Sequence, residues 1–211
     1  TALEQAEALR GQRILLAQPR ADVGLKVTGS LGEATLQEAV YGPILDQLAD
    51  HKPKTLGQLE QALKATPSTQ SLSFAQILQA AMVLSATGAV QAVQDDAVIQ
   101  KAKKRTDRLN VYLMTKARSS NELSYLASPV TGGGVTVPRF QQLFLLAKQQ
   151  GHKQPQDWAS FVWNILALQN QRLVKDGKTL ETVEENLAEL TAQASEFAEK
   201  QLPILKALQI A

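Results

Sequence analysis

The sequence LASPVTGGGVTVPR, residues 126–139, is the stretch around which the rest of the chain is organised. Glycine loses more conformational entropy on folding than any other residue, so a compact domain keeps three in a row where a positive φ or a close backbone approach is useful. Pro129 and Pro138 stiffen both ends, and Pro138 stands where a helix can begin. The stretch therefore predicts a shaped loop, flexible at its centre and held at its edges.

Two interpretations of this loop remain open. It is either a contact or hinge loop, or a tight connection between two helical layers. A phosphate cradle is disfavoured because no clear strand leads in, no Gly-Lys-Ser/Thr follows, and the spacing is not that of a dinucleotide-binding fingerprint. For a contact role the candidate residues are Ser128, Pro129, Thr131, Gly132, Gly133, Gly134 and Arg139.

The composition is that of an ordinary globular protein, with 44% hydrophobic and 20% charged residues in a chain of 211. The net charge is +2, so no global field draws the protein to nucleic acid or to anionic lipid. No apolar run approaches the ~20 residues of a membrane span. The absence of cysteine fits a reducing, cytoplasmic location, and a start at Thr1 predicts a piece of a longer protein.

The first half of the chain predicts a winged-helix-like subdomain over residues 1–98. Its expected elements are a helix over 1–10, strand candidates at 14–17, 25–28 and around 34–36, a helix from Gly42-Pro43 to Leu48, two helices that begin at capping boxes, and a strand over 89–93. The capping boxes are Thr55 with Gln58 and Ser73 with Gln76. The second of these helices is expected to bury Phe74, Ile77, Leu78, Ala81 and Met82.

A winged helix raises the question of DNA binding, since its third helix commonly enters a major groove. The third helix here, residues 73–87, contains no lysine or arginine, whereas phosphate contacts usually carry much of the affinity for DNA. Protein contact is therefore the favoured role. The alternative is a nucleic-acid-binding winged-helix protein that uses the basic residues between Lys101 and Arg108.

The second half predicts a helical subdomain over residues 99–211, which makes the fold class mainly α with minor β. Helices are expected over 99–117, 138–150 and 156–174, then from a capping box at Thr182 to Leu202-Pro203, and finally over 204–211. Trp158 and Trp163 lie at spacings typical of core residues, although they could also line a groove. The apolar seam from Leu180 to Phe197 is suited to intramolecular packing or to a homodimer contact.

No catalytic constellation can be assembled from the sequence. His51 and His152 lie in polar turns without metal-ligand spacing, and are interpreted as surface residues. The paired carboxylates Asp95-Asp96 and Glu184-Glu185 are explained by a turn and by a helix start. We therefore predict no catalytic, cofactor-binding or metal-binding residue in this chain, and no enzymatic activity of the chain alone. A free-standing enzyme of unrecognised type is a further alternative.

The stretches 126–134, 140–146 and 168–173 resemble the C-terminal part of bacterial class I S-adenosylmethionine-dependent methyltransferases. These enzymes carry a methyltransferase regulatory domain after the catalytic domain, and bacterial protein-lysine methyltransferases are among them. Residues 11–50 look like the end of that regulatory region, and residues 55–93 fit the same layout.

The resemblance implies a non-catalytic module that recognises substrate, regulates the enzyme or mediates its dimerisation. The glycine-rich cofactor loop and the acidic ribose-binding residue of the catalytic domain have no counterpart here. The expected partners are accordingly an upstream catalytic domain, which would bind S-adenosylmethionine, a protein substrate and a second copy of the chain. Within the glycine loop, a valine at Gly133 is expected to strain any positive-φ conformation.

Overall fold

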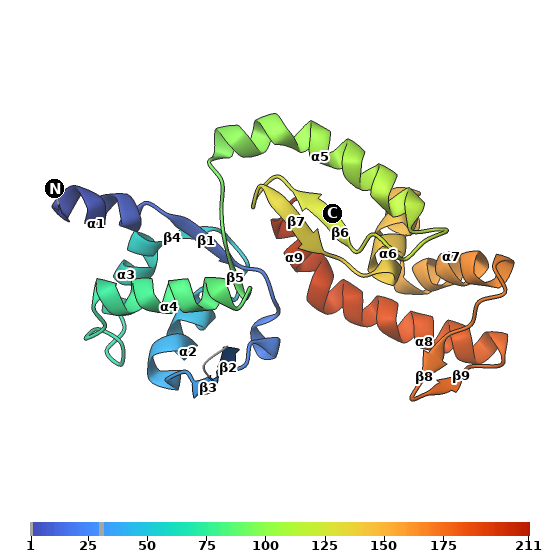
Figure 1. Ribbon diagram of the computed structural model, residues 1–211, viewed down its shortest axis with the longest axis horizontal. Helices are drawn as coiled ribbons and strands as arrows, with labels where there is room; N and C mark the ends of the chain where they lie inside the picture. Colours follow the sequence, from blue (N-terminus) through green and yellow to red (C-terminus); the bar gives the residue numbers. More distant parts are fainter. Residues whose placement is uncertain (1, 30–31) are drawn as a thin grey trace. The chain divides into compact units, whose positions relative to one another are not determined.

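The structure is a computed structural model that describes residues 2–29 and 32–211. Helices make up the larger part of the described chain and the strands are short, which confirms the mainly α class with minor β. The chain divides into two compact units, one ending at Asp96 and the other beginning at Ala97 (Figure 1). None of the helices in the described ranges combines the length and the apolar character needed to cross a bilayer.

The first unit combines short helices with short strands. Its elements are α1 (Ala2–Arg10), β1 (Arg13–Leu16), β2 (Lys26–Gly29), β3 (Gly32–Thr35), α2 (Glu38–Gln47), β4 (Lys54–Thr55), α3 (Leu56–Lys64), α4 (Phe74–Ala86) and β5 (Val90–Ala92), with a 3-10 turn at Arg20–Asp22. The helices α2, α3 and α4 pack on one another, and their buried leucines and isoleucines form one core with residues of β1 and β5.

The three-stranded sheet of this unit has the order β4-β1-β5, with both pairings antiparallel, and β2 pairs separately with β3. Its central strand β1 comes from before the three packed helices, and Leu16 of β1 lies opposite Val90 of β5. In a winged helix, the strand predicted over 89–93 would continue into a β-ribbon. That strand is present as β5, but it pairs antiparallel with the earlier strand β1, and the chain then enters a helix. The expectation failed because strand pairing is a long-range contact that local patterns do not specify.

Both capping boxes of the first unit are confirmed. The Thr55 hydroxyl accepts from Gln58 N at 3.0 Å, and the Gln58 side chain accepts from Thr55 N at 2.8 Å. The Ser73 and Gln76 pair repeats this arrangement at the start of α4. These motifs were predictable because both partners lie within one turn of sequence.

Several predicted details of the helices are wrong. Helix α2 begins at Glu38, so that Pro43 lies inside it. Met82, which was expected to be buried, is 65% exposed on α4, and the apolar residues Leu3 and Leu9 are also exposed on α1. Helical spacing identifies a face, but only the neighbours in space decide whether that face is covered.

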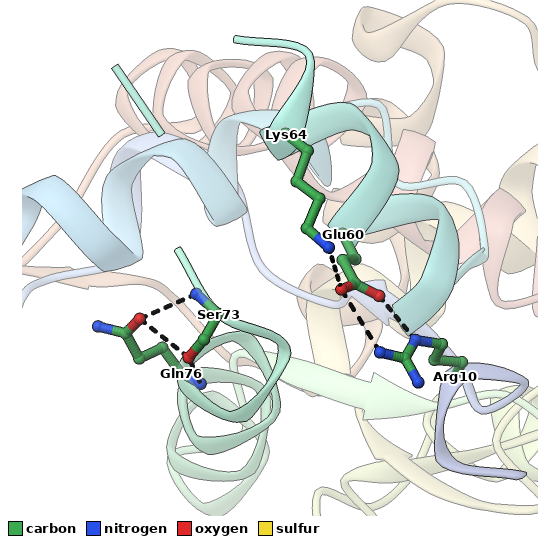
Figure 2. A network of polar contacts seen from close by, with 5 residues as sticks. All are labelled: Arg10, Glu60, Lys64, Ser73 and Gln76. Carbon is green, nitrogen blue, oxygen red and sulfur yellow. Dashed lines mark hydrogen bonds and ion pairs between the residues drawn. The ribbon is translucent and has the colours of Figure 1, made fainter. Parts of the chain in front are cut away.

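An ion-pair network joins α1 to α3 and is drawn in Figure 2. The Glu60 carboxylate accepts from Arg10 Nε at 2.7 Å and from Lys64 Nζ at 2.7 Å. Arg10 also places its guanidinium 4.2 Å from the centre of the Phe74 ring, on α4. Hydrogen bonds from Arg10 and then Lys64 hold the pKa of Glu60 at about 2, below its usual 4.5.

The second unit is built mainly from longer helices. Its elements are α5 (Asp96–Lys116), which starts on the last residue of the first unit, then β6 (Tyr125–Ser128), β7 (Gly133–Thr136), α6 (Arg139–Gln149), α7 (Pro155–Leu168), β8 (Val174–Lys175), β9 (Lys178–Thr179), α8 (Val183–Glu196) and α9 (Leu202–Ala207). The core lies where α7 packs between α6 and α8, with Trp158 buried beside Phe197. The predicted core role of Trp158 is confirmed.

Two predicted helix ends in this unit are wrong. The helix expected over 156–174 ends at Leu168, and residues 174–179 form a hairpin that turns at Asp176 and Gly177, both at positive φ. The last long helix does not end at Pro203: α8 continues through a π-helical segment, Phe197–Gln201, into α9 (Figure 1). The widened π turn accommodates the proline, which lacks an N–H and crowds the preceding turn of a regular helix.

Replacing Glu60 by glutamine should lower the free energy of unfolding at pH 7 by about 1–2 kcal/mol, because the network loses its anion. The folded-state pKa of Glu60 lies below its unfolded value, so the network's contribution is complete above pH 4.5 and is lost as the pH falls towards 2. Urea denaturation at several pH values, followed by circular dichroism, should show less acid destabilisation in Glu60→Gln than in the parent. The exposed Glu33→Gln is the matched control; equal acid sensitivity in all three proteins would contradict the assignment.

Candidate functional site

The glycine stretch is the turn and second strand of a β-hairpin. Strands β6 and β7 pair antiparallel, with Tyr125 opposite Thr136 and Ser128 opposite Gly133. A strand therefore does lead into the glycines, contrary to the sequence-based expectation, and the stretch is more than a loop. Glycine-rich strands carry little β signal in sequence, because they lack the side chains on which that signal rests.

The three glycines have different roles. Gly132 adopts φ 73° in the turn, and its N–H donates to the Ser128 carbonyl at 3.0 Å. Gly133 and Gly134 have no positive φ and belong to β7. The strain expected from a valine at Gly133 was therefore wrongly placed; the position that needs glycine for its backbone conformation is Gly132.

Ser128 and Pro129 are buried, and Ser128 connects the hairpin to the end of the chain. Its hydroxyl donates to the Leu208 carbonyl at 2.8 Å and accepts from the N–H groups of Val130 and Thr131 at 3.2 and 3.3 Å. These contacts shape the turn from inside. Because both side chains are buried, neither Ser128 nor Pro129 is exposed for contact with another molecule.

Arg139, at the start of α6, is half-buried, and its guanidinium bonds to neighbouring segments of the same unit. Its Nε donates to the Ala117 carbonyl at 2.8 Å, and its terminal nitrogens donate to the Arg118 carbonyl at 3.2 Å and to the side-chain oxygens of Gln169 and Gln171. Burial lowers the pKa of Arg139. The arginine therefore neutralises the carbonyl end of α5 and joins it to the segment after α7.

Asn110 is a residue of this site that the sequence analysis missed. It is 2% exposed on the inward face of α5. Its amide nitrogen donates to the Ala127 carbonyl at 2.8 Å, and its amide oxygen accepts from the Ala127 N–H at 2.7 Å. At Ala127 the side chain thus makes the two hydrogen bonds that a neighbouring strand would make. The sequence signal is weak, because Asn110 is a polar residue while the apolar residue beside it, Leu109, is 47% exposed.

The remaining candidates form the exposed part of the hairpin. Thr131 is half-buried and its hydroxyl accepts from Gly133 N at 3.4 Å, while Gly132, Gly133 and Gly134 are exposed. On the strand opposite, Tyr125 is 60% exposed. The seven predicted residues therefore separate into an inner, structural group and an outer surface made largely of main chain.

Helix α5 carries a second exposed surface. Lys103 is paired with Asp107, but no such pairing is found in the described residues for the exposed side chains of Lys101, Lys104, Arg105 and Arg108. Helix α4, by contrast, has no basic residue, and the Gln76 side chain is used in its cap. A hollow of about 350 Å³ beside α4 is lined by Gln76, Gln79, residues of α2 and residues 35–37 before it, with no cation among the lining residues.

The titratable groups with shifted pKa values take part in structural contacts. Gln193 and Lys175 lower the pKa of Glu189, and the capping box at Thr182 lowers that of Glu185. The two histidines are half-buried rather than free on the surface: His51 Nδ1 lies 2.8 Å from the Leu16 carbonyl, and the His152 ring packs on Phe161. Within the described residues no three His, Asp or Glu side chains converge as metal ligands would.

Comparison with known proteins connects the chain to a longer one. It is 37% identical over 207 residues to the uncharacterized protein sll1526 of Synechocystis sp.. The match covers 98% of this chain but 39% of the relative. The chain thus spans well under half the length of that relative. No family model matches the sequence. No solved structure matches it either.

Replacing Asn110 by alanine should destabilise the second unit by about 1–3 kcal/mol, because the N–H and C=O of Ala127 lose their partners in a half-buried place. Hydrogen exchange at the Ala127 amide should accelerate more than at amides of α7. Thr115→Ala, on the exposed face of the same helix, is the matched control and should leave both rates unchanged. Slow exchange at Ala127 in the Asn110 variant would show that the side chain is dispensable.

Proposed function

We propose that this chain is a non-catalytic accessory region of an S-adenosylmethionine-dependent methyltransferase that acts on a protein or another macromolecule. In this role it recognises substrate, regulates the enzyme or mediates dimerisation, while a separate catalytic domain binds the cofactor. The proposal includes a cytoplasmic location.

The observation that carries the proposal is the stretch from Leu126 to Leu146. The residues that resemble the methyltransferase family form a hairpin followed directly by α6, and Ser128 and Arg139 anchor that hairpin and helix to other parts of the same unit. A module that presents a rigid, exposed turn is suited to contact rather than to chemistry, since the exposed part contains a hydroxyl and main-chain groups but no titratable side chain except Tyr125.

The length of the relative supports the same proposal. A segment that matches 39% of a longer protein leaves room in that protein for a catalytic domain.

Calorimetric titration with S-adenosylmethionine is the direct test. The isolated chain should produce no binding heat, whereas the full-length Synechocystis relative should bind the cofactor. The relative without the region that matches this chain should still bind S-adenosylmethionine but should transfer methyl groups to its macromolecular substrate at least tenfold more slowly. Cofactor binding by the isolated chain, or a full-length relative that neither binds the cofactor nor transfers methyl groups, would contradict the proposal.

The exposed cations of α5 favour nucleic-acid binding as a second candidate function. If Lys101, Lys104, Arg105 and Arg108 contact phosphates, the affinity for single-stranded RNA or duplex DNA should fall with salt, with a log–log slope of about −0.7 to −0.9 for each contact. Exchanging Lys104 and Arg108 for alanine should reduce the magnitude of the slope by about two such steps. The matched control exchanges Lys148 and Lys153, which are exposed elsewhere in the unit. Affinity that is independent of salt would exclude this function.

A further inference from the structure

The outer edge of β7 carries main-chain groups that have no partner in the described chain. In an antiparallel pair, the N–H and C=O of successive residues point alternately towards the partner strand and away from it. Ala127 directs both groups away from β7, because both are bonded to Asn110. Its partner in the register, Gly134, must therefore direct its own N–H and C=O away from β6, and so must Thr136, two residues further on.

The remaining contacts agree with this alternation. The N–H of Val137 donates to the Ser124 carbonyl at 2.8 Å, which continues the bonded pairs of the ladder beyond β7. No hydrogen bond from elsewhere in the described chain reaches the outward main-chain groups of Gly134 or Thr136, and both residues are exposed. Unpaired groups of this kind on an exposed strand are a template for another strand.

The β7 edge also lacks the residues and bulges that usually interrupt an exposed edge. No lysine, proline or bulge interrupts Gly133–Thr136, and the sequence there is Gly-Gly-Val-Thr. The fold itself does not require glycine at these positions. A Cβ on Gly133 would meet nothing within 4 Å, and one on Gly134 would lie at an ordinary 3.7 Å from Tyr125.

Tyr125 adds a side-chain contact to this edge. Its ring lies beside Gly134, across the hairpin, and the side chain is 60% exposed. Because Gly134 has no side chain, a residue added next to it could place its own side chain against the ring on the same face of the sheet. The edge thus combines main-chain donors and acceptors with one aromatic surface.

We propose that the outer edge of β7 binds an extended peptide segment of a partner polypeptide. The N–H groups of Gly134 and Thr136 donate to the peptide and their carbonyls accept from it, as in other cases of strand addition. This inference is independent of the reaction that any longer protein performs.

A peptide fits this edge better than a second copy of the chain does. Symmetric pairing of β7 with itself would join two strands of four residues. That contact falls well short of the roughly 1,200–2,000 Å² that stable interfaces bury. It would also place glycines near the shared axis, where they offer no cross-strand side-chain packing. Short extended peptides, in contrast, derive their affinity from the main chain and need only one or two side-chain contacts.

The test titrates the nitrogen-15-labelled full chain with the end-blocked hexapeptide KTVTVK, up to about 1 mM. The amide resonances of Gly134 and Thr136 should shift, and their hydrogen exchange should slow at least fivefold. The amides of Leu126 and Val135 face into the hairpin and should change little. The same peptide with its central amides N-methylated should bind at least tenfold more weakly, because it can no longer donate to the edge.

Gly134→Pro removes one outward N–H and should weaken binding at least tenfold, while proline is tolerated at an edge position of this kind. Gly133→Ala, whose N–H faces β6, is the matched control and should bind as the parent does. Peptide-induced shifts confined to other elements, no shifts at all, or full affinity of the N-methylated peptide would overturn the proposal. Concentration-dependent shifts of Gly134 and Thr136 without peptide would assign the edge to a second copy instead.

Discussion

The bidentate hydrogen bond between Asn110 and the backbone of Ala127 is the contact on which the second unit's hairpin depends. An isolated two-stranded hairpin is marginally stable in water. Here the Asn110 side chain of α5 bonds to the main chain of Ala127 in β6, where a third strand would otherwise pair, and so stabilises the hairpin. The Ser128 hydroxyl then holds the turn against the Leu208 carbonyl. Local and distant contacts thus cooperate to fix a segment that contains three consecutive glycines.

The same interaction creates an asymmetry between the two edges. Because Asn110 occupies the edge of β6 at Ala127, the residues across the hairpin whose outward main-chain groups remain available are Gly134 and Thr136 of β7. The inner members of the predicted loop, Ser128, Pro129 and Arg139, hold this arrangement in place. The outer members, Thr131 and the three glycines, form the exposed part of the hairpin. A contact function for the hairpin is therefore compatible with a structural role for three of the seven residues that the sequence analysis had grouped together.

The first unit shows a similar division between local and distant determinants. The capping boxes at Thr55 and Ser73, like the one at Thr182 in the second unit, could be predicted because both partners lie three residues apart. The placement of β1 at the centre of the sheet could not, since its partners lie some 40 and 75 residues further along the chain. The Arg10–Glu60 ion pair was missed for the same reason. Exposed apolar residues such as Leu3 and Met82 show that a helical pattern does not identify its neighbour.

The sequence by itself determined the mainly α class and the starts of the capped helices, because each depends on residues within one or two turns of each other. Only the tertiary structure decided that the glycines form a hairpin, that Asn110 rather than Leu109 faces it, and that the helix containing Pro203 continues through a π turn. Each of these features depends on which groups meet across long stretches of chain. These long-range contacts are selected by the packing of the whole unit, and no local pattern of residue types encodes them.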